Sequence, residues 1–212
     1  MPGCAVPDEH AIDARIQRRA AVRCAVDLIG AVVLLVAALP LMVFAALAIR
    51  LDDGGPWLYR QERVGRNRRP FLLLKFRTMR TDAEADGEAR WAGAADPRVT
   101  RVGGFLRRTR IDELPQLVNV LRGEMSLIGP RPERPSFVEQ LERELPGYAL
   151  RHRALPGLTG YAQVHAGYSA SVAEAHAKLA GDLHYLQHQS LALDVEIAAR
   201  TVAVVLTGRG AR

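Results

Sequence analysis

The sequence predicts an α+β domain held at a membrane by one N-terminal helix, and three observations lead to this prediction. The 212 residues leave room for one compact domain but not for several. An uncharged apolar run of 22 residues covers 28–49, and the rest of the chain mixes one strand-like run with several segments of helical spacing. We divide the chain into an N-terminal tail (1–22), a membrane helix with its linker (23–56) and a folded domain (57–212).

The apolar run would form a helix of about 33 Å, which is long enough to cross a bilayer. Four arginines between residues 15 and 23 precede it and six between residues 50 and 69 follow it, so the positive-inside rule draws both flanks to the same side. A helix that bends at Pro40 and returns satisfies both flanks, because proline removes a backbone hydrogen bond and favours a kink. A plain single-pass anchor is the alternative that the residues alone leave open.

The remaining elements follow in order along the chain. Residues 57–70 combine aromatic and basic side chains, which predicts an interfacial turn at the lipid headgroups. The apolar run at 71–79 predicts a strand, and acidic residues with Ala and Gly at 80–96 predict a loop or a frayed helix. Helical spacing predicts helices at 98–108, 112–121, 137–144 and 172–186, and an amphipathic, interfacial helix at 191–206.

The charge of the chain indicates an anionic partner. Lysine and arginine number 29 against 23 aspartate and glutamate residues, a net charge of +6, which suits nucleic acid, a phosphorylated substrate or acidic lipid. Only two of these cations are lysines, Lys75 and Lys178. The two cysteines, Cys4 and Cys24, lack the number and spacing of a disulfide or zinc framework, which favours a reducing compartment.

The segment 107–121 carries the strongest candidate site. Proline is tolerated in the first turn of a helix and not deeper, so Pro115 places Asp112 and Glu113 at or just before a helix N-terminus. The unpaired N–H groups there stabilise a carboxylate and attract phosphate oxygens. Such a site can hold a nucleophilic carboxylate against a phosphoryl group, and two adjacent carboxylates can hold Mg²⁺ against a diphosphate. The alternative is that Asp112 only caps the helix and that Glu113 is solvated.

A second motif supplies a cation in a stiff turn. Arg131 lies between Pro130 and Pro132, so its guanidinium would lose little entropy when it binds phosphate oxygens. An ion pair with Glu133 or Glu124 is the alternative for this arginine.

A third motif is the pair Lys75 and Arg77. Residues two apart share one face of an extended segment, so these two side chains could clamp a phosphate. A solvated basic edge strand is the alternative. Tyr161 follows a Pro-Gly turn and could stack on a base, while the i, i+4 spacing of His184 and His188 is more typical of surface histidines than of a metal site.

Three strings and the C-terminal segment resemble one family, the bacterial sugar transferases or monotopic phosphoglycosyl transferases. The strings are KFRTM (75–79), DELPQLVNVLRGEMSLIGPRPE (112–133) and PGLTGYAQV (156–164). In the C-terminal segment the residues that fall in the family's spacing are Asp182, Tyr185, Asp194 and Thr201. The resemblance covers the chain from Arg23 onward, and the central string is its most specific part.

The resemblance implies an enzyme that moves a sugar-1-phosphate from a UDP-sugar to a polyprenyl phosphate. In that family the aspartate of the Asp-Glu pair is the nucleophile, which forms a covalent phosphosugar intermediate and releases UMP. The glutamate completes the dyad, and Mg²⁺ is the cofactor. Asp112 and Glu113 match this pair, so residues 57–212 would form the catalytic domain. The family also has a re-entrant membrane helix kinked at proline, which favours the bent form at Pro40.

We therefore expect Asp112 and Glu113 to be catalytic and to bind the metal. The residues that we expect to bind substrate or phosphate are Lys75, Arg77, Arg131, Glu133, Thr159 and Gln163. Covalent catalysis would split the transfer between a soluble and a lipid substrate into two steps, and the cations would stabilise charge on both phosphates.

The chain departs from the family pattern at three places. Leu39 precedes the membrane proline where serine is usual, and Tyr161 stands where tryptophan is commoner. Gly167 and Tyr168 replace a Gly-Arg pair, which affects the expected substrate affinity or nucleotide choice and not the dyad.

These expectations place the protein at the bacterial inner membrane with its catalytic domain on the cytoplasmic face, where it would initiate a surface glycan. Its partners would be UDP-sugar, polyprenyl phosphate and the membrane, and not nucleic acid; a homo-oligomer stays open. Two other functions are kept as alternatives. One is a membrane-tethered nucleic-acid binder that uses the arginines at 60–69 and 107–110, and the other is a non-catalytic scaffold of glycan assembly.

Overall fold

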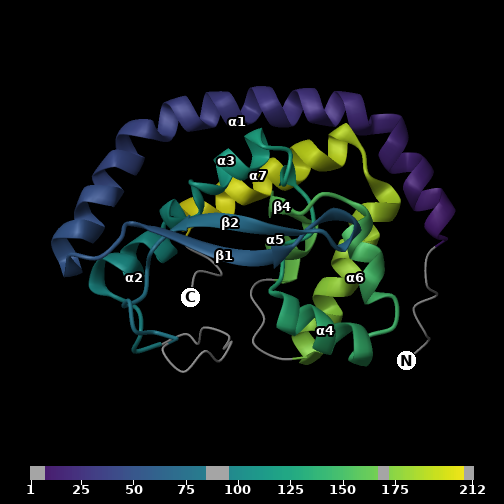
Figure 1. The fold of residues 1–212 in the computed structure, drawn as a ribbon. Coiled ribbons are helices and arrows are strands. Elements are labelled where there is room, and N and C mark those ends of the chain that lie inside the picture. The colour runs from purple at the N-terminus through teal and green to yellow at the C-terminus, as the bar shows by residue number, and fades with distance from the viewer. Residues whose placement is uncertain (1–7, 85–95, 167–171, 208–212) are drawn as a thin grey trace.

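The computed structural model describes residues 8–84, 96–166 and 172–207, and these form a mixed helix-and-strand fold (Figure 1). In chain order the elements are α1 (Glu9–Asp53), β1 (Leu58–Val64), η1 (Arg66–Arg68), β2 (Pro70–Phe76), α2 (Arg101–Arg108), η2 (Ile111–Glu113), α3 (Gln116–Leu121), β3 (Ser126–Ile128), α4 (Pro135–Glu144), η3 (Tyr148–Arg153), β4 (Gly157–Thr159), α5 (Tyr161–Ala166), α6 (Val172–His188) and α7 (Leu191–Thr207). The elements labelled η are short 3-10 helices. This mixture confirms the expected combination of helices and strands.

Helix α1 is one continuous helix of 45 residues that arches over the rest of the molecule (Figure 1). Asp8 caps its first turn by accepting a hydrogen bond from the His10 backbone N–H at 2.9 Å. Gly54 ends it at φ +73°, a left-handed conformation that suits glycine. Pro40 lies inside the helix and does not end it, so α1 curves past the proline in one piece.

The first turns of α1 extend into the segment that the domain division assigned to the N-terminal tail. Residues 9–22 were expected to belong to a tail, but they are helical. Alanine, arginine and glutamine in this stretch favour helix, and Arg153 of η3 pairs with Asp13 at 3.3 Å and also with Glu9. These ion pairs hold the start of α1 against the domain. Cys4 lies outside the described residues.

Most apolar side chains of α1 point away from the domain. Among the described residues α1 alone is long and apolar enough, by length and composition, to cross a membrane. Only 11% of its most apolar window is buried, whereas the core helix of a water-soluble domain would bury most of that window. The outer face of α1 therefore needs an apolar environment outside the chain.

The inner face of α1 packs on the domain through small residues and polar contacts. A Cβ at Gly30 would lie 2.7 Å from the Leu127 side chain, so glycine permits the close approach. Arg23 donates to the Ile128 carbonyl at 2.6 Å, and the Asp27 carboxylate accepts from the Leu127 N–H at 2.9 Å. These bonds join α1 to β3.

Strands β1 and β2 form an antiparallel hairpin that runs from Leu58 opposite Phe76 to Val64 opposite Pro70. The hairpin corrects the interfacial turn predicted at 57–70 and confirms the predicted strand that follows. Residues in β1 alternate between more and less buried positions, as expected for a strand that pairs with the apolar run. The basic residues of this segment are therefore divided between a strand and the hairpin turn.

Strands β3 and β4 form a separate parallel pair, with Ser126 opposite Gly157 and Ile128 opposite Thr159. A Cβ on Gly157 would lie 2.1 Å from the Gly129 backbone nitrogen, so no larger residue fits. This close contact fixes the chain just before the proline-rich turn that carries Arg131.

Asn119 joins α3 to β2 and is fully buried. Its Oδ1 accepts from the Leu74 N–H at 3.0 Å, and its Nδ2 donates to the Leu72 carbonyl at 2.8 Å and to the Glu124 carboxylate at 2.6 Å. A buried amide that makes all of these bonds is strongly specified in position. Asn119 thus sets the segment after η2 against the hairpin.

Most of the predicted helices are present. Those expected at 98–108, 137–144, 172–186 and 191–206 correspond to α2, α4, α6 and α7. The helix expected at 112–121 is divided into η2 and α3 around Pro115, which has no N–H to donate to a continuous helix. Helix α7 buries Ile197 completely but leaves the apolar Val195 68% exposed. Only the ends of the predicted loop 80–96 lie within the described residues.

Candidate active site

Asp112 and Glu113 lie on η2, between α2 and α3. Arg110 precedes this turn at φ +59°, a strained conformation for a residue with a side chain. Its carbonyl accepts from the Glu113 N–H at 3.2 Å, and η2 then packs on β2. Helix α3 begins at Gln116, so the predicted position of the two carboxylates just before a helix N-terminus is confirmed.

Asp112 is a buried carboxylate with an unused acceptor. It is 8% exposed, and its Oδ1 is buried without a hydrogen-bond partner among the described residues. Burial, and then the negative charge of Glu113, raise the pKa of Asp112 to about 7, while the charges of Lys75, Arg131 and Arg107 lower it. Asp112 therefore exists in both protonation states near neutral pH.

Glu113 is held in the ionised form by arginine. Arg131 donates to both carboxylate oxygens of Glu113, at 2.7 and 3.4 Å, and Arg110 lies 3.8 Å from one of them. Burial acts to raise the pKa of Glu113, but the charge and hydrogen bonds of Arg131 outweigh it, so the pKa of Glu113 is lowered. Two neighbouring carboxylates thus have pKa values that are pushed apart, a pattern typical of catalytic pairs.

Lys75 approaches the dyad from β2. Burial, and then the charge of Arg63, lower the pKa of Lys75 to about 8, and Asp112 opposes this shift. Its ammonium lies 5.2 Å from the centre of the Tyr59 ring on the paired strand, a distance typical of a cation–π contact. The charge of Lys75 therefore acts on Asp112, and phosphate binding by Lys75 remains a prediction.

Arg77 does not accompany Lys75. Strand β2 ends at Phe76, so the shared face predicted from i, i+2 spacing does not extend to Arg77. Its buried guanidinium pairs with Asp53 at the end of α1 and lies close against Gly55. The predicted clamp of Lys75 and Arg77 is not formed, and phosphate binding by Arg77 remains a prediction.

Arg107 and Arg110 are cations that the sequence analysis did not assign to the dyad. Arg107 lies in the last turn of α2, its Nε donates to the Thr78 hydroxyl at 2.9 Å, and its charge lowers the pKa of Asp112. The sequence signal was its place five residues before Asp112, in a segment that also fitted a nucleic-acid binder. Because Arg107 and Arg110 interact with the dyad carboxylates, part of the basic surface that a nucleic-acid binder would use is already paired with acidic groups.

The two glutamates considered as alternative ion-pair partners of Arg131 contact other residues. Glu133 is 3.5 Å from Arg63, and Glu124 accepts from Asn119. Arg131, by contrast, forks onto Glu113. The stiff turn therefore directs its arginine to the dyad.

Thr159 is the last residue of β4, and Gln163 lies on α5. The Thr159 hydroxyl lies 2.7 Å from that of Thr201 on α7, and Gln163 donates to the Leu158 carbonyl at 3.2 Å. Gln163 Oε1 is buried without a partner among the described residues. Substrate binding by these two residues remains a prediction.

Tyr161 packs against two histidine rings, and base stacking by Tyr161 remains a prediction. Its ring lies 4.1 Å from the His165 ring and 4.7 Å from the His184 ring, centre to centre. His188 stacks on His184 in turn, at 4.3 Å. Within residues 8–84, 96–166 and 172–207 no three His, Cys, Asp or Glu side chains are grouped to hold a metal, so His184 and His188 are stacked rings and not part of such a group.

The dyad and its surroundings suit chemistry on a phosphate. Lys75, Arg107, Arg110 and Arg131 supply positive charge around two carboxylates, one of which has a free oxygen. Charges act strongly in a buried, fixed environment, because little water screens them. The arrangement can present a carboxylate oxygen to phosphorus and stabilise the negative charge of the phosphates on either side.

A scan against protein-family models matches residues 18–208 to the bacterial sugar transferase model. The chain belongs to the bacterial sugar transferase family. The match begins within α1 and contains every later element to the end of α7. It confirms the family predicted from the strings around the dyad.

Several curated relatives align with this chain over most of its length. It is 47% identical over 186 residues to the UDP-N-acetylgalactosamine-undecaprenyl-phosphate N-acetylgalactosaminephosphotransferase of Aeromonas hydrophila, covering 88% of this chain and 44% of that one. It is 45% identical over 183 residues to the UDP-glucose:undecaprenyl-phosphate glucose-1-phosphate transferase of Caulobacter vibrioides, covering 85% and 68%. It is 42% identical over 193 residues to the exopolysaccharide production protein PSS of Rhizobium leguminosarum, covering 88% and 96%. The chain thus spans less than half of one relative and nearly all of another.

Asp112 and Glu113 are the residues expected to hold Mg²⁺. The unpartnered Oδ1 of Asp112 is a hard oxygen ligand of the kind that Mg²⁺ prefers, and Mg²⁺ commonly uses one or two carboxylates together with substrate phosphates. Glu113 is adjacent, although Arg131 already donates to both of its oxygens. The donor set fits a cation shared between Asp112 and a bound diphosphate.

Of the departures at Leu39 and at Gly167–Tyr168, the structure places Leu39. Leu39 is 55% exposed on the outer face of α1, next to a proline that the helix passes without ending. Gly167 and Tyr168 lie outside the described residues.

Proposed function

We propose that this protein transfers a sugar-1-phosphate from a UDP-sugar to a polyprenyl phosphate through a covalent intermediate on Asp112. The observation that carries the proposal is the buried Asp112 carboxylate. One of its oxygens has no hydrogen-bond partner among the described residues, and the positive charges of Lys75, Arg107 and Arg131 act on it. A carboxylate that only capped a helix would use its oxygens on backbone N–H groups. The names of the relatives, which include undecaprenyl-phosphate sugar phosphotransferases, support the substrate class.

In the first step an ionised Asp112 oxygen would attack the phosphorus that carries the sugar. A bond forms between that oxygen and phosphorus, the bond to the bridging oxygen breaks, and its electron pair leaves with UMP. Lys75 and Arg107 approach Asp112 from β2 and α2, where they would stabilise the charge that develops on the transferred and leaving phosphates. The raised pKa of Asp112 makes its carboxylate a stronger base and a better nucleophile than an exposed aspartate.

In the second step an oxygen of the polyprenyl phosphate would attack the same phosphorus. The aspartyl–phosphorus bond breaks, the sugar-linked polyprenyl diphosphate leaves, and Asp112 is regenerated. Glu113 stays ionised beside it, since Arg131 holds both of its oxygens. Mg²⁺ bound by Asp112 and Glu113 would neutralise charge on the diphosphate.

We place the protein at the bacterial inner membrane, with residues 57–212 on the cytoplasmic face and α1 re-entering the bilayer around Pro40. Two observations support this topology. Arginines flank the apolar segment on both sides, and both ends of α1 bend toward the domain in Figure 1. Such a placement would bring the dyad near a lipid phosphate while the UDP-sugar arrives from water.

The test is release of UMP by the purified protein in the presence of Mg²⁺, undecaprenyl phosphate and a panel of UDP-sugars that includes UDP-glucose and UDP-N-acetylgalactosamine. The proposal predicts UMP release by the wild type with at least one sugar and none by Asp112→Asn. Asp82→Asn is the matched control, because Asp82 is 61% exposed and pairs only with a neighbouring arginine in the described structure. A scaffold would release no UMP, and full activity of Asp112→Asn would refute the proposed nucleophile.

A further inference from the structure

The turn that carries Arg131 is held by four donors, one for each of four successive carbonyls. The Pro130 carbonyl accepts from the Gly157 N–H at 2.8 Å, and the Glu133 carbonyl accepts from the Val64 N–H at 3.0 Å. The carbonyls between them, on residues 131 and 132, accept from two arginine side chains, the buried Arg151 at 2.8 Å and the partly buried Arg63 at 3.0 Å. Prolines at 130 and 132 fix two φ angles as well. The backbone of this turn therefore has little freedom.

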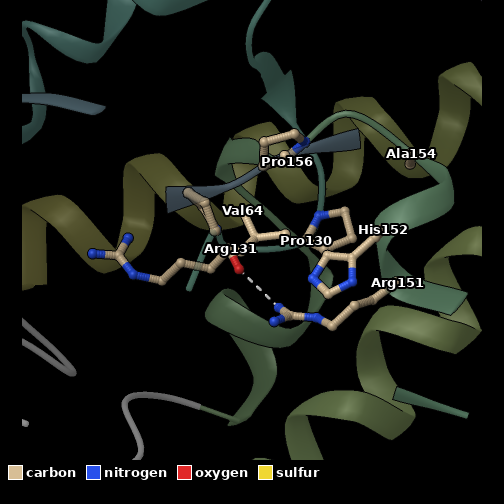
Figure 2. A pocket seen from close by; sticks show the side chains of 9 residues that line it. Val64, Pro130, Arg131, Arg151, His152, Ala154 and Pro156 are labelled. Atoms are coloured by element: carbon tan, nitrogen blue, oxygen red, sulfur yellow. Dashed lines mark hydrogen bonds between the residues drawn. The ribbon is translucent and has the colours of Figure 1, made fainter. Parts of the chain in front are cut away.

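Figure 2 shows how Arg151 meets the turn. The Arg131 carbonyl points to the Arg151 guanidinium, while the Arg131 side chain leaves on the opposite side. That side chain is the one that forks onto Glu113 at 2.7 and 3.4 Å. A single residue thus joins the Arg151 network, through its backbone, to the dyad, through its guanidinium.

The Arg151 guanidinium is itself held on every side. Its Nε donates to Asp182 at 3.0 Å, one terminal nitrogen donates to the Tyr148 hydroxyl at 2.7 Å, and the other lies 2.7 Å from Asp182 and donates to the Arg131 carbonyl. Arg151 is 5% exposed and Asp182 is 3% exposed. A buried ion pair of this kind is costly to form and adds little stability, so its value lies in fixing geometry.

The next residue along η3 does not compete for these partners. Burial, and then the charge of Arg151, lower the pKa of His152 to about 3, so its ring is neutral. His152 lines the small pocket beside Pro130 and Pro156. His152 therefore adds no positive charge next to the Arg151 guanidinium.

We infer that Arg151, held by Asp182 and Tyr148, is a positioning residue for the transfer reaction: it fixes the backbone of Arg131 so that the Arg131 guanidinium holds Glu113 beside Asp112. The inference rests on the proposed function of the dyad and goes beyond it, because Arg151 touches neither carboxylate in the contacts described. Lysine at position 151 could keep the charge pair with Asp182, but it lacks the planar fork that also reaches Tyr148 and the carbonyl.

The test is a double-mutant cycle between Arg151→Lys and Arg131→Lys. The readout is the burst rate of UMP release by the full-length protein at saturating UDP-sugar, using whichever of UDP-glucose and UDP-N-acetylgalactosamine the wild type accepts. Arg151→Lys alone should slow the burst by about 10- to 100-fold, since a small misplacement of catalytic groups has effects of this size. In the Arg131→Lys background the same change should cost less than about 3-fold, because the fork onto Glu113 is already lost.

The control is Arg153→Lys, which makes the same substitution two residues away at a 38% exposed side chain, and it should leave the burst rate unchanged. If Arg151→Lys does not fold, the same cycle is run with Tyr148→Phe, which removes one partner of Arg151 and keeps the ring. Equal losses in both Arg131 backgrounds would show that Arg151 acts on general stability and would overturn the inference. A wild type that releases no UMP would instead overturn the proposed function, and the inference with it, before any variant is compared.

Discussion

The rate of adduct formation should follow a narrow bell-shaped dependence on pH. Asp112 must be ionised to attack, and its pKa is raised to about 7, so activity is lost as the pH falls through 7. Lys75 must be protonated to stabilise phosphate charge, and its pKa is lowered to about 8, so activity is lost as the pH rises through 8. The product of the two fractions peaks at about pH 7.5 and falls about 6-fold by pH 6 and by pH 9.

The perturbation that assigns the limbs is Lys75→Met. Removing this cation should take away the alkaline limb and move the acidic limb to higher pH, because Lys75 is one of the charges that lower the pKa of Asp112. The assay is stopped-flow or quenched-flow measurement of the UMP burst, with no polyprenyl phosphate present, between pH 5.5 and 9.5. A wild-type rate that stays level from pH 6 to 7.5 would refute the claim that Asp112 titrates near neutrality.

Three further predictions concern stability. Asp112→Asn should be inactive yet more stable by about 2–4 kcal/mol at pH 8. The reason is that folding raises the pKa of the Asp112 carboxyl from 3.8 to about 7, so the cost of ionising it in the folded state grows between these pH values and is constant above them. Thermal melts that give equal gains in stability at pH 5 and pH 8 would contradict this. Gly103→Ala should lower the free energy of unfolding by about 1–3 kcal/mol, since its Cβ would lie 2.1 Å from the Thr78 carbonyl oxygen. Its control is Gly104→Ala, whose Cβ would lie 3.9 Å from the nearest atom and which should be neutral in urea unfolding. Asn119→Ala should cost about 2–5 kcal/mol by leaving buried strand groups unpaired, and a smaller loss in the same assay would mean that water replaces the amide.

Local sequence signals predicted the dyad because they are local in the structure too. Pro115 interrupts the helix just after Asp112 and Glu113, and the stiff Pro-Arg-Pro turn directs Arg131 to Glu113. The apolar length of α1 was likewise visible in composition alone. These features depend on backbone constraints within a few residues, which a sequence displays directly.

The features that were missed depend on contacts far apart in the chain. Arg77 turns to Asp53 because β2 ends one residue earlier and the end of α1 lies beside it. The Arg151 network joins η3, α6 and the Arg131 turn, and no spacing in the sequence connects them. Residues 9–22 are helical partly because η3 supplies an ion-pair partner. Tertiary partners, and not local propensity, decided each of these cases.

The central claim is that Asp112 forms a bond to the phosphosugar, and mass spectrometry of the trapped protein tests it most directly. Wild-type protein incubated with Mg²⁺ and an accepted UDP-sugar, without lipid acceptor, should gain one sugar phosphate on the peptide that contains Asp112, and added polyprenyl phosphate should remove it. UMP release with an unmodified Asp112 peptide, or with the adduct on another residue, would contradict the account.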